Sequence, residues 1–341
     1  YKTNIGLEMM LWGKLNLTLD YYWERRKDIL IQRSSLPSMA GFDASIYANM
    51  GEMDNKGVDA NLEYQTRIGN KVGLRLFGNL TYSKNKIVFR DEPAMQYAYQ
   101  KSEGTRYGEF YGYIAEGYFQ SEEEIKKSPR QMRELAPGDI KYKDLNDDGV
   151  IDANDQCYLG KSWFPSWSYG MGFNINYHNF DLALFFQGVS DVSIMANGGS
   201  IDTGNGDWGA SGVGIVPFTG MGLNPSNVIT KALDRWTADN PRADAWYPRM
   251  TANATTNDNN YVNSTHWLKD GSYLRLKQAS LGYTLENKKL MDKGIEYLYF
   301  YLSGQNLLTF SKFKLWDPEL GSNGAKYPLS RMVTLGMRVS F

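Results

Sequence analysis

The stretch "WSYGMGFNINY", residues 167–177, alternates large apolar or aromatic side chains with small or polar ones. The large set is Trp167, Tyr169, Met171, Phe173, Ile175 and Tyr177, and the small or polar set is Ser168, Gly170, Gly172, Asn174 and Asn176. Successive side chains of a β-strand point to opposite faces of a sheet. This period of two therefore predicts a strand with one apolar face and one polar face.

The same alternation recurs along the chain, for example in "KLNLTLDYYWE" (14–24), "VDANLEYQ" (58–65), "VGLRLFGNLTYS" (72–83) and "VTLGMRVSF" (333–341). The polar face is rich in Gly, Asn, Ser and Arg, whereas the apolar face has large aliphatic and aromatic residues. A barrel with lipid outside and water inside requires this arrangement. Nine crossings are predicted, at 1–11, 14–33, 53–67, 71–88, 165–177, 180–189, 267–284, 295–309 and 328–341.

The connections between these strands come in two sizes that alternate strictly. The short ones are 12–14, 68–71, 178–179 and 286–294, and the long ones are 34–52, 89–165, 190–266 and 310–327. Outer-membrane barrels have short periplasmic turns and long extracellular loops. The predicted fold class is therefore all-β, a transmembrane antiparallel β-barrel with long extracellular loops.

The number of strands indicates that the barrel is incomplete. Nine is odd, whereas bacterial single-chain barrels have an even number of strands, and an open wall would leave unpaired edges in lipid. The chain begins at Tyr1, without Met or a signal peptide. Residues 1–341 are therefore expected to be the C-terminal portion of a larger barrel.

Composition excludes several classes of function. The 341 residues have a formal net charge of −1, which gives no reason to expect a nucleic-acid partner. The single cysteine, Cys157, excludes an intrachain disulfide. The sequence contains no Ser-His-Asp spacing, phosphate loop or Cys-His metal cluster, so we expect no enzyme and no catalytic residues.

One segment has the composition of a calcium-binding loop: "DLNDDGVIDAND", residues 144–155. Gly149 occupies the sharp-turn position, and the six ligand positions hold Asp144, Asn146, Asp148, Val150 (through its carbonyl), Asp152 and Asp155. Position 12 is Asp rather than the usual Glu, and the flanking helices of an EF-hand are missing. Two interpretations stay open: a structural calcium site, or a metal-free turn whose side chains bind their own backbone.

The long connections carry further predictions. Short helices are expected at 121–135, ended by Pro137, and at 224–240, with Ser226 as its N-cap. Among the loop aromatics Trp163, Trp208 and Trp246, packing is favoured over stacking on sugar rings. Substrate-binding residues cannot be assigned from the sequence.

Three features of the strands complete the predictions. Arg275 and Arg338 are expected to line the lumen. The alternation slips near 277–279, which predicts a β-bulge. In 295–304 both faces are apolar, so that strand cannot be oriented from its pattern.

Several motifs resemble one known family. These are "PGDIKYKDLNDDGVIDANDQCYLG", "PSWSYGMGFNINYHNFDLALFFQG", "WLKDGSYLRLKQASLGYTL", "YLSGQNLLTF" and "DPE", in this order, with a terminal Phe341. Together they are similar to the C-terminal part of SusC/RagA-like TonB-dependent transporters of Bacteroidota. The resemblance implies the last nine strands of a 22-strand barrel in the outer membrane of a Gram-negative bacterium. It also implies a plug domain and a TonB-interacting segment, neither of which is in this sequence.

The resemblance implies TonB-dependent import of glycans or oligopeptides, with a SusD-like surface lipoprotein as a lid and membrane lipid around the barrel. Two alternatives remain open from the residues. One is a passive outer-membrane porin, which would lack the plug. The other is a secreted calcium-stabilised β-sandwich that binds carbohydrate, in which the apolar strand faces would turn inward.

Overall fold

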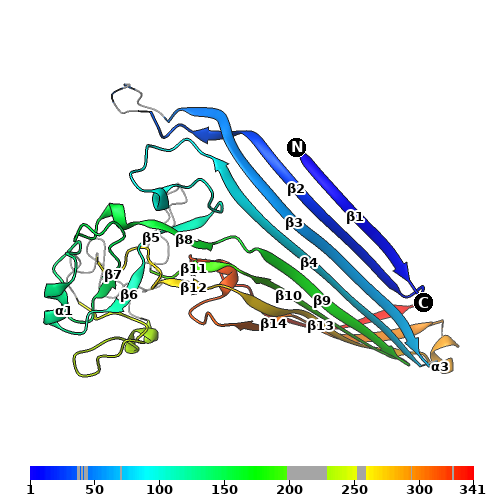
Figure 1. Cartoon of the computed structure of the whole chain (residues 1–341). Helices are drawn as coiled ribbons and strands as arrows, with labels where there is room; N and C mark the ends of the chain where they lie inside the picture. Colours follow the sequence, from blue (N-terminus) through cyan, green and yellow to red (C-terminus); the bar gives the residue numbers. More distant parts are fainter. Residues whose placement is uncertain are drawn as a thin grey trace.

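A computed structural model describes residues 1–36, 39, 41, 45–69, 71–197, 229–251, 259–292, 294–324 and 326–341. Nine of its strands form one antiparallel sheet, in the order β1-β2-β3-β4-β9-β10-β13-β14-β15 (Figure 1). Their bounds are Lys2–Leu11, Leu15–Gln32, Tyr47–Ile68, Val72–Phe89, Trp167–Tyr177, Phe180–Ser190, Tyr273–Leu285, Tyr297–Ser311 and Met332–Ser340. This single curved sheet confirms the predicted strand count and fold class, and it differs from the two packed sheets of a sandwich.

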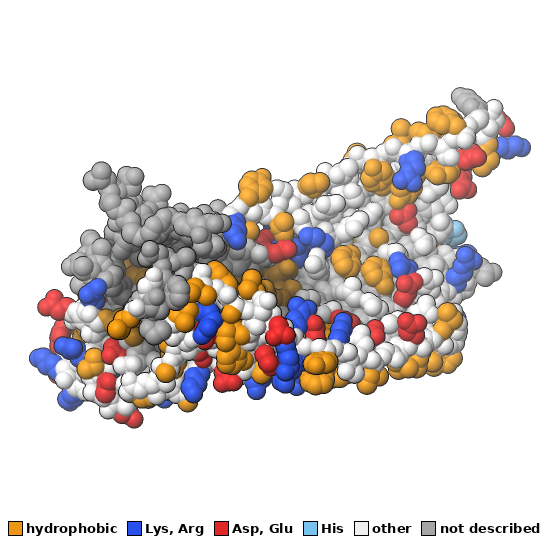
Figure 2. Space-filling model, turned by 90° about the horizontal axis from the view of Figure 1, so that it is seen from above, with side chains coloured by type: hydrophobic (Ala, Val, Ile, Leu, Met, Phe, Trp, Pro, Cys, Tyr) orange, Lys and Arg blue, Asp and Glu red, His pale blue; other side chains and the backbone are white. Residues whose placement is uncertain are grey.

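The register aligns the apolar sets of neighbouring strands in rows. In one such row, Ile175 pairs with Leu182, Leu182 with Leu281, Leu281 with Leu302, and Leu302 with Leu335. Because directly paired residues point to the same side of a sheet, one face is apolar across β9 to β15. Figure 2 shows the hollowed side of the wall from above, with charged side chains over its inner surface.

The register also orients β14, whose sequence is apolar on both faces. Leu298 and Leu302 lie in the apolar rows, whereas Tyr299 lies on the opposite face, where its hydroxyl donates to Asp181 Oδ2 at 3.0 Å. Tyr299 can therefore lie on the polar face, because its hydroxyl forms a hydrogen bond there. The predicted bulge is confirmed, since the register of β13 against both neighbours shifts between Leu276 and Gln278.

The tight turns gather at one end of the sheet and the long connections at the other (Figure 1). At the tight end, Trp12 and Gly13 both have positive φ, 53° and 61°, and Lys14 N–H donates to Leu11 O at 3.1 Å, as in a β-turn of type I′. The longer connection 286–296 contains the short helix α3 (Lys288–Met291). Three strand starts differ from prediction by four residues or more: β3 begins at Tyr47 rather than 53, β13 at Tyr273 rather than 267, and β15 at Met332 rather than 328.

The described parts of 90–166 and 191–272 fold together, and we call them the loop domain. Three two-stranded sheets pair β5 (Glu109–Gly112) with β8 (Cys157–Ser162), β6 (Ala115–Tyr118) with β7 (Ile140–Tyr142), and β11 (Ser193–Met195) with β12 (Leu268–Asp270). Helical turns are α1 (Glu122–Lys127), η2 (Ala98–Gln100), η3 (Ala153–Asp155) and η5 (Thr230–Leu233); η6 (Pro318–Leu320) lies in the last long connection.

Both predicted loop helices are wrong in extent. The first is α1 alone, since Pro129 forces the preceding Ser128 into extended backbone (ψ 160°) and the helix stops long before Pro137. Of the second, the described residues 229–240 contain only the turn η5. Ser226 and Trp208 lie outside the described residues. Within the described part of the chain, no helix is both long and apolar enough to cross a membrane.

Candidate functional site

The loop domain is held by a core that draws on both long connections. Its buried members are Phe110, Tyr113, Tyr118, Ile140, Tyr142, Ile151, Met195, Ala232, Trp236, Ala245, Tyr247 and Trp267. Trp267 is fully buried, and its ring contacts those of Trp246, Tyr247 and Tyr261. Backbone bonds join the two connections as well: Tyr113 N–H donates to Asn263 O at 2.9 Å, and Thr265 N–H donates to Tyr113 O at 3.0 Å.

A buried charge pair links the same two connections. The carboxylate of Asp139 has no solvent exposure, and Arg249 Nη2 donates to its Oδ2 at 2.9 Å. Arg249 Nε lies 2.7 Å from Oδ1, although its N–H is not directed at that oxygen. Asn260 Nδ2 donates to Oδ1 at 2.8 Å, and Ala136 N–H donates to Oδ2 at 2.8 Å. The carboxylate therefore binds three residues: Ala136 from its own connection, and Arg249 and Asn260 from the other.

Gly138 makes this arrangement possible. Its φ of 92° is a conformation that other residues rarely adopt. A Cβ at this position would also lie 2.2 Å from the Trp236 ring. Arg249 N–H donates to Gly138 O at 2.9 Å, so the backbone supports the Asp139–Arg249 pair.

The predicted calcium loop, 144–155, adopts a compact turn. Gly149 N–H donates to Asp144 Oδ2 at 2.8 Å, and Val150 N–H donates to Asp148 Oδ1 at 2.9 Å. Asp155 is fully buried and accepts from Leu145 N–H at 2.7 Å and from Asp152 N–H at 2.9 Å. These bonds are those of the metal-free interpretation, in which side chains satisfy their own backbone.

One atom in this loop is unsatisfied: Asp144 Oδ1 is buried and has no hydrogen-bond partner. A bare buried carboxylate oxygen is costly, and a cation at the first ligand position would satisfy it. Among the described residues, however, no three His, Cys, Asp or Glu side chains are grouped as metal ligands. The calcium site therefore stays a prediction, with one orphaned oxygen in its favour.

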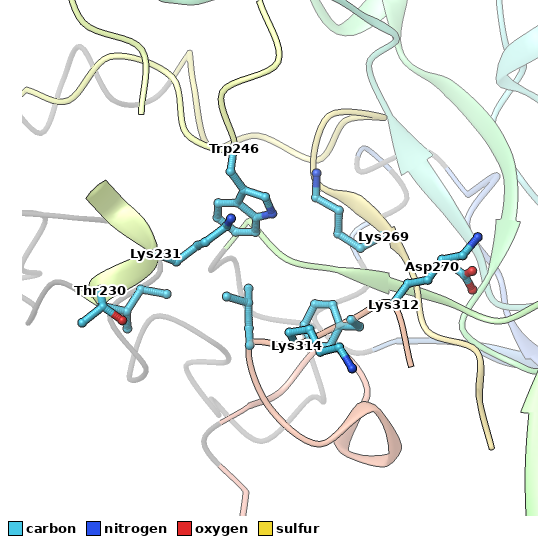
Figure 3. A pocket seen from close by; sticks show the side chains of 10 residues that line it. Thr230, Lys231, Trp246, Lys269, Asp270, Lys312 and Lys314 are labelled. Carbon is cyan, nitrogen blue, oxygen red and sulfur yellow. The ribbon is translucent and has the colours of Figure 1, made fainter. Parts of the chain in front are cut away.

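The loop domain also contains a cavity of about 970 Å³, between η5, β12 and the segment after β14. Figure 3 shows its side chains arranged around one space. The lining residues are Ile229, Thr230, Lys231, Trp246, Lys269, Asp270, Lys312, Phe313, Lys314 and Leu315. The sequence did not predict this site, because its four lining segments (229–231, Trp246, 269–270 and 312–315) are distant in the chain. For Trp246, packing and cavity lining coexist, because the ring also contacts Tyr247 and Trp267.

Two ionisable groups in this part of the loop domain have perturbed pKa values. Burial, with the nearby charge of Lys231 adding to it, lowers the pKa of Lys269 to about 8. Burial, together with the charge of Lys269, lowers the pKa of His266 to about 4. His266 Nε2 lies 3.2 Å from Trp246 O and 3.3 Å from the Tyr118 hydroxyl. His266 is therefore a neutral hydrogen-bonding residue at physiological pH.

Arg275 lies on the polar, lumen-side face of the wall as predicted, where it pairs with Gln187 and Thr309. Its side chain is only 2 % exposed, because the last long connection covers it. Arg275 Nη2 donates to Asp317 Oδ1 at 2.6 Å and lies 3.5 Å from Glu319 Oε2. The "DPE" motif thus anchors the last long connection to β13. Asp317 is the N-cap of η6, and Glu319 N–H donates to the same Oδ1 at 3.0 Å, which orients the carboxylate that Arg275 binds.

Other predicted residues lie where expected. Arg338 lines a polar groove of about 520 Å³ on the inner face, with Asp181, Tyr297 and Tyr299. Trp163 packs edge-on against Phe110 and also contacts Phe164, which agrees with the packing interpretation. Cys157 is buried.

The family profile described as "TonB dependent receptor-like, beta-barrel" matches residues 2–307. The chain belongs to this family. The long connections that form the loop domain are therefore parts of a TonB-dependent receptor barrel, which lies in the outer membrane.

Named relatives agree. TonB-dependent receptor P3 of Formosa agariphila is 27% identical over 99% of this chain, and TonB-dependent receptor SusC of Bacteroides thetaiotaomicron is 23% identical over 99%. The alignments cover 34% and 31% of those proteins, so the chain spans about a third of their length. A structure of the RagAB peptide importer in the 'closed-closed' state matches all of this chain and 35% of its own, with a TM-score of 0.72 and 22% identity. The predicted SusC/RagA resemblance and outer-membrane location are confirmed.

Proposed function

We propose that this chain forms the C-terminal wall of a TonB-dependent importer that takes up glycans or oligopeptides with a SusD-like lipoprotein as its lid. The observation that carries the proposal is the placement of a folded loop domain at one end of a wall with continuous apolar and polar faces. In this arrangement the apolar face contacts lipid, the polar face lines the passage, and the loop domain lies outside the cell.

The loop domain supports selective capture rather than passive flow. A passive pore needs an open lumen. Here the two long connections share a core of twelve buried residues and form one packed domain beside the wall. Its cavity has apolar and charged side chains, the composition of ligand sites. The chain performs no covalent chemistry in this proposal; its residues bind, orient and pass the substrate.

Uptake measured in cells that produce the full-length protein tests the proposal. Deleting its gene or the TonB gene is expected to abolish growth on the imported oligomer, and growth on its monomer serves as the control. The SusD-like lipoprotein should co-purify with the full-length protein. Uptake that persists without TonB would instead indicate a porin.

We further propose that 144–155 holds one calcium ion with a structural role, through Asp144, Asn146, Asp148, Asp152, Asp155 and the carbonyl of Val150. The orphaned Asp144 oxygen supports this, and an ion there would add charge neutralisation to a turn rich in carboxylates. The role would be local, because the core of the loop domain already joins the two long connections.

Asp144→Asn is expected to weaken calcium binding at least tenfold, since it removes a charged ligand but keeps an acceptor for Gly149 N–H. Wild-type affinity should be about 0.1–1 mM, as in other external modules, measured by calorimetry on the full-length protein. The matched control is Asp147→Asn, at a position without a ligand role. Equal calcium binding by both variants and wild type, or no binding at 10 mM, would exclude the site.

A further inference from the structure

The cavity between η5, β12 and 312–315 concentrates positive charge. Its lining contains four lysines and one carboxylate, although the whole chain has a formal net charge of −1. The lysines come from three separate segments: Lys231 from η5, Lys269 from β12, and Lys312 and Lys314 from the stretch after β14 (Figure 3). The fold therefore brings together cations that the sequence keeps apart.

Two of the four lysines, Lys269 and Lys314, have no internal counter-ion among the described residues. Lys231 Nζ pairs with Asp234 at 2.8 Å. Burial acts to raise the pKa of Asp270, but Lys312 lies close enough to this carboxylate for its charge to lower that pKa. Within the described part of the chain, no carboxylate forms an ion pair with the ammonium group of Lys269 or Lys314. Clustered like charges repel, more so beside apolar walls such as Phe313 and Leu315, and an anionic ligand would relieve that repulsion.

Lys269 is held in place by two uncharged groups. Its Nζ donates to His266 O at 2.6 Å and lies 5.3 Å from the centroid of the Trp246 ring. A carbonyl and a π-face orient an ammonium group without neutralising it. The group therefore keeps its charge available to a ligand that enters the cavity.

We propose that this cavity binds an oligosaccharide that carries carboxylate or sulfate groups. The inference rests on the proposed import function and names its substrate class. The volume of about 970 Å³ is in the upper range of ligand pockets and suits several linked sugar rings. Carboxylate and sulfate are both anions that accept hydrogen bonds. A lysine ammonium is a point charge that can bind either of them, whereas arginine favours planar partners that it binds in a bidentate manner.

The half-buried Trp246 ring favours a saccharide over an acidic peptide. An aromatic face suits the apolar face of a pyranose ring, whose acidic groups project from the rim toward the flanking lysines. One recurring mode of peptide recognition pairs an extended peptide with a strand edge through main-chain hydrogen bonds. The cavity offers instead a ring and cations, all on side chains.

The pH dependence of binding should follow Lys269. Around it lie Lys231 with Asp234, His266, Asp270, Lys312 and Lys314. Burial lowers the pKa of Lys269 to about 8, and a bound anion raises it. Below pH 8 the group is already charged and binding is strongest. As pH rises above 8, binding must take up a proton, so affinity falls.

Calorimetry on the purified full-length transporter tests the proposal with four probes: trigalacturonate, a sulfated galactan tetrasaccharide, neutral maltotriose and the peptide triglutamate. One or both anionic saccharides should bind at least tenfold more tightly than maltotriose and triglutamate. The better of the two identifies the acidic group. Tighter binding of triglutamate, or no preference over maltotriose, overturns the proposal.

The double variant Lys269→Gln/Lys314→Gln should weaken anionic saccharide binding at least tenfold, while Gln can still donate to His266 O. The matched control, Lys126→Gln/Lys127→Gln, removes two charges from α1 and should leave binding unchanged. Should the first variant unfold the loop domain, the salt dependence of the wild type decides: affinity must fall steeply between 50 and 500 mM NaCl. These measurements need no TonB, so their failure is distinct from failure of energised import.

Discussion

Replacing Arg249 with Met is expected to destabilise the loop domain by ~3–5 kcal/mol, because it leaves a buried carboxylate without its counter-charge. Asp139 is fully buried, and its remaining partners, Asn260 and Ala136, supply hydrogen bonds but no charge. Met fills much of the volume of the arginine stem, so the loss is mainly electrostatic. Hydrogen exchange of the full-length protein should show faster exchange in peptides around 110–142 and 259–267, with β9 and β10 unaffected.

A double-mutant cycle separates charge from packing. In the Asp139→Asn background, Arg249→Met should cost much less than in the wild type, because no buried charge is left unpaired. Arg242→Met is the matched control in the same domain: Arg242 pairs with Asp234 and Asp244 at the solvent-accessible surface, so the change should be within ~1 kcal/mol. Equal costs of Arg249→Met in the two backgrounds would mean that the Asp139–Arg249 pair has no stabilising role.

The strands of the wall could be predicted from the sequence because the alternation of apolar and polar residues is a local pattern. Each strand has a period of two, and a shift of one residue would move every apolar side chain to the wrong face. In the structure Leu182 pairs with Ile175 and Leu281 on the apolar face. The pattern predicts the face of each side chain, and the fold sets which residues are paired. Even the bulge near Lys277 was visible as a break in alternation. The pattern failed for 295–304, where tyrosines occupy the polar face.

The loop domain could not be predicted, because its contacts join distant parts of the chain. The sequence predicts Trp267 as the start of a barrel strand, whereas in the structure it is buried in a core that also contains Phe110. Residues 268–270 are expected to belong to the strand that follows, but they form β12, which pairs with β11 outside the large sheet. The break in alternation at 269–272 is the local sign that β12 and β13 are separate strands, but it does not reveal that β12 pairs with β11.

Arg275 illustrates the same limit. Its place in an alternating strand predicts a lumen-facing side chain, and only the fold reveals Asp317 beside it. The calcium loop could be predicted because all its ligand positions lie within twelve consecutive residues, unlike Arg275 and Asp317. Such a local motif can be found from sequence, although its occupancy depends on chemistry that a turn alone does not determine.

The outward face of the wall yields the second large effect: Leu62→Arg should destabilise the barrel by ~2–4 kcal/mol if Leu62 lies near the bilayer midplane. Leu62 is 44% exposed and pairs with Leu17 and Gly78, inside the apolar rows of β2 to β4. In lipid, the guanidinium of the variant would have to reach the interface or draw in water, and either costs free energy.

The neighbouring residue provides the matched control. Asn61 pairs with Thr18 and Asn79 on the opposite face, so Asn61→Arg places the same charge in the aqueous passage and should change stability by less than ~1 kcal/mol. Urea unfolding of the full-length protein in lipid vesicles measures both variants. A larger loss for Asn61→Arg than for Leu62→Arg would reverse the assignment of faces. The lumen would then lie on the leucine side, and the proposed polar passage along Asp181 and Arg338 would be wrong.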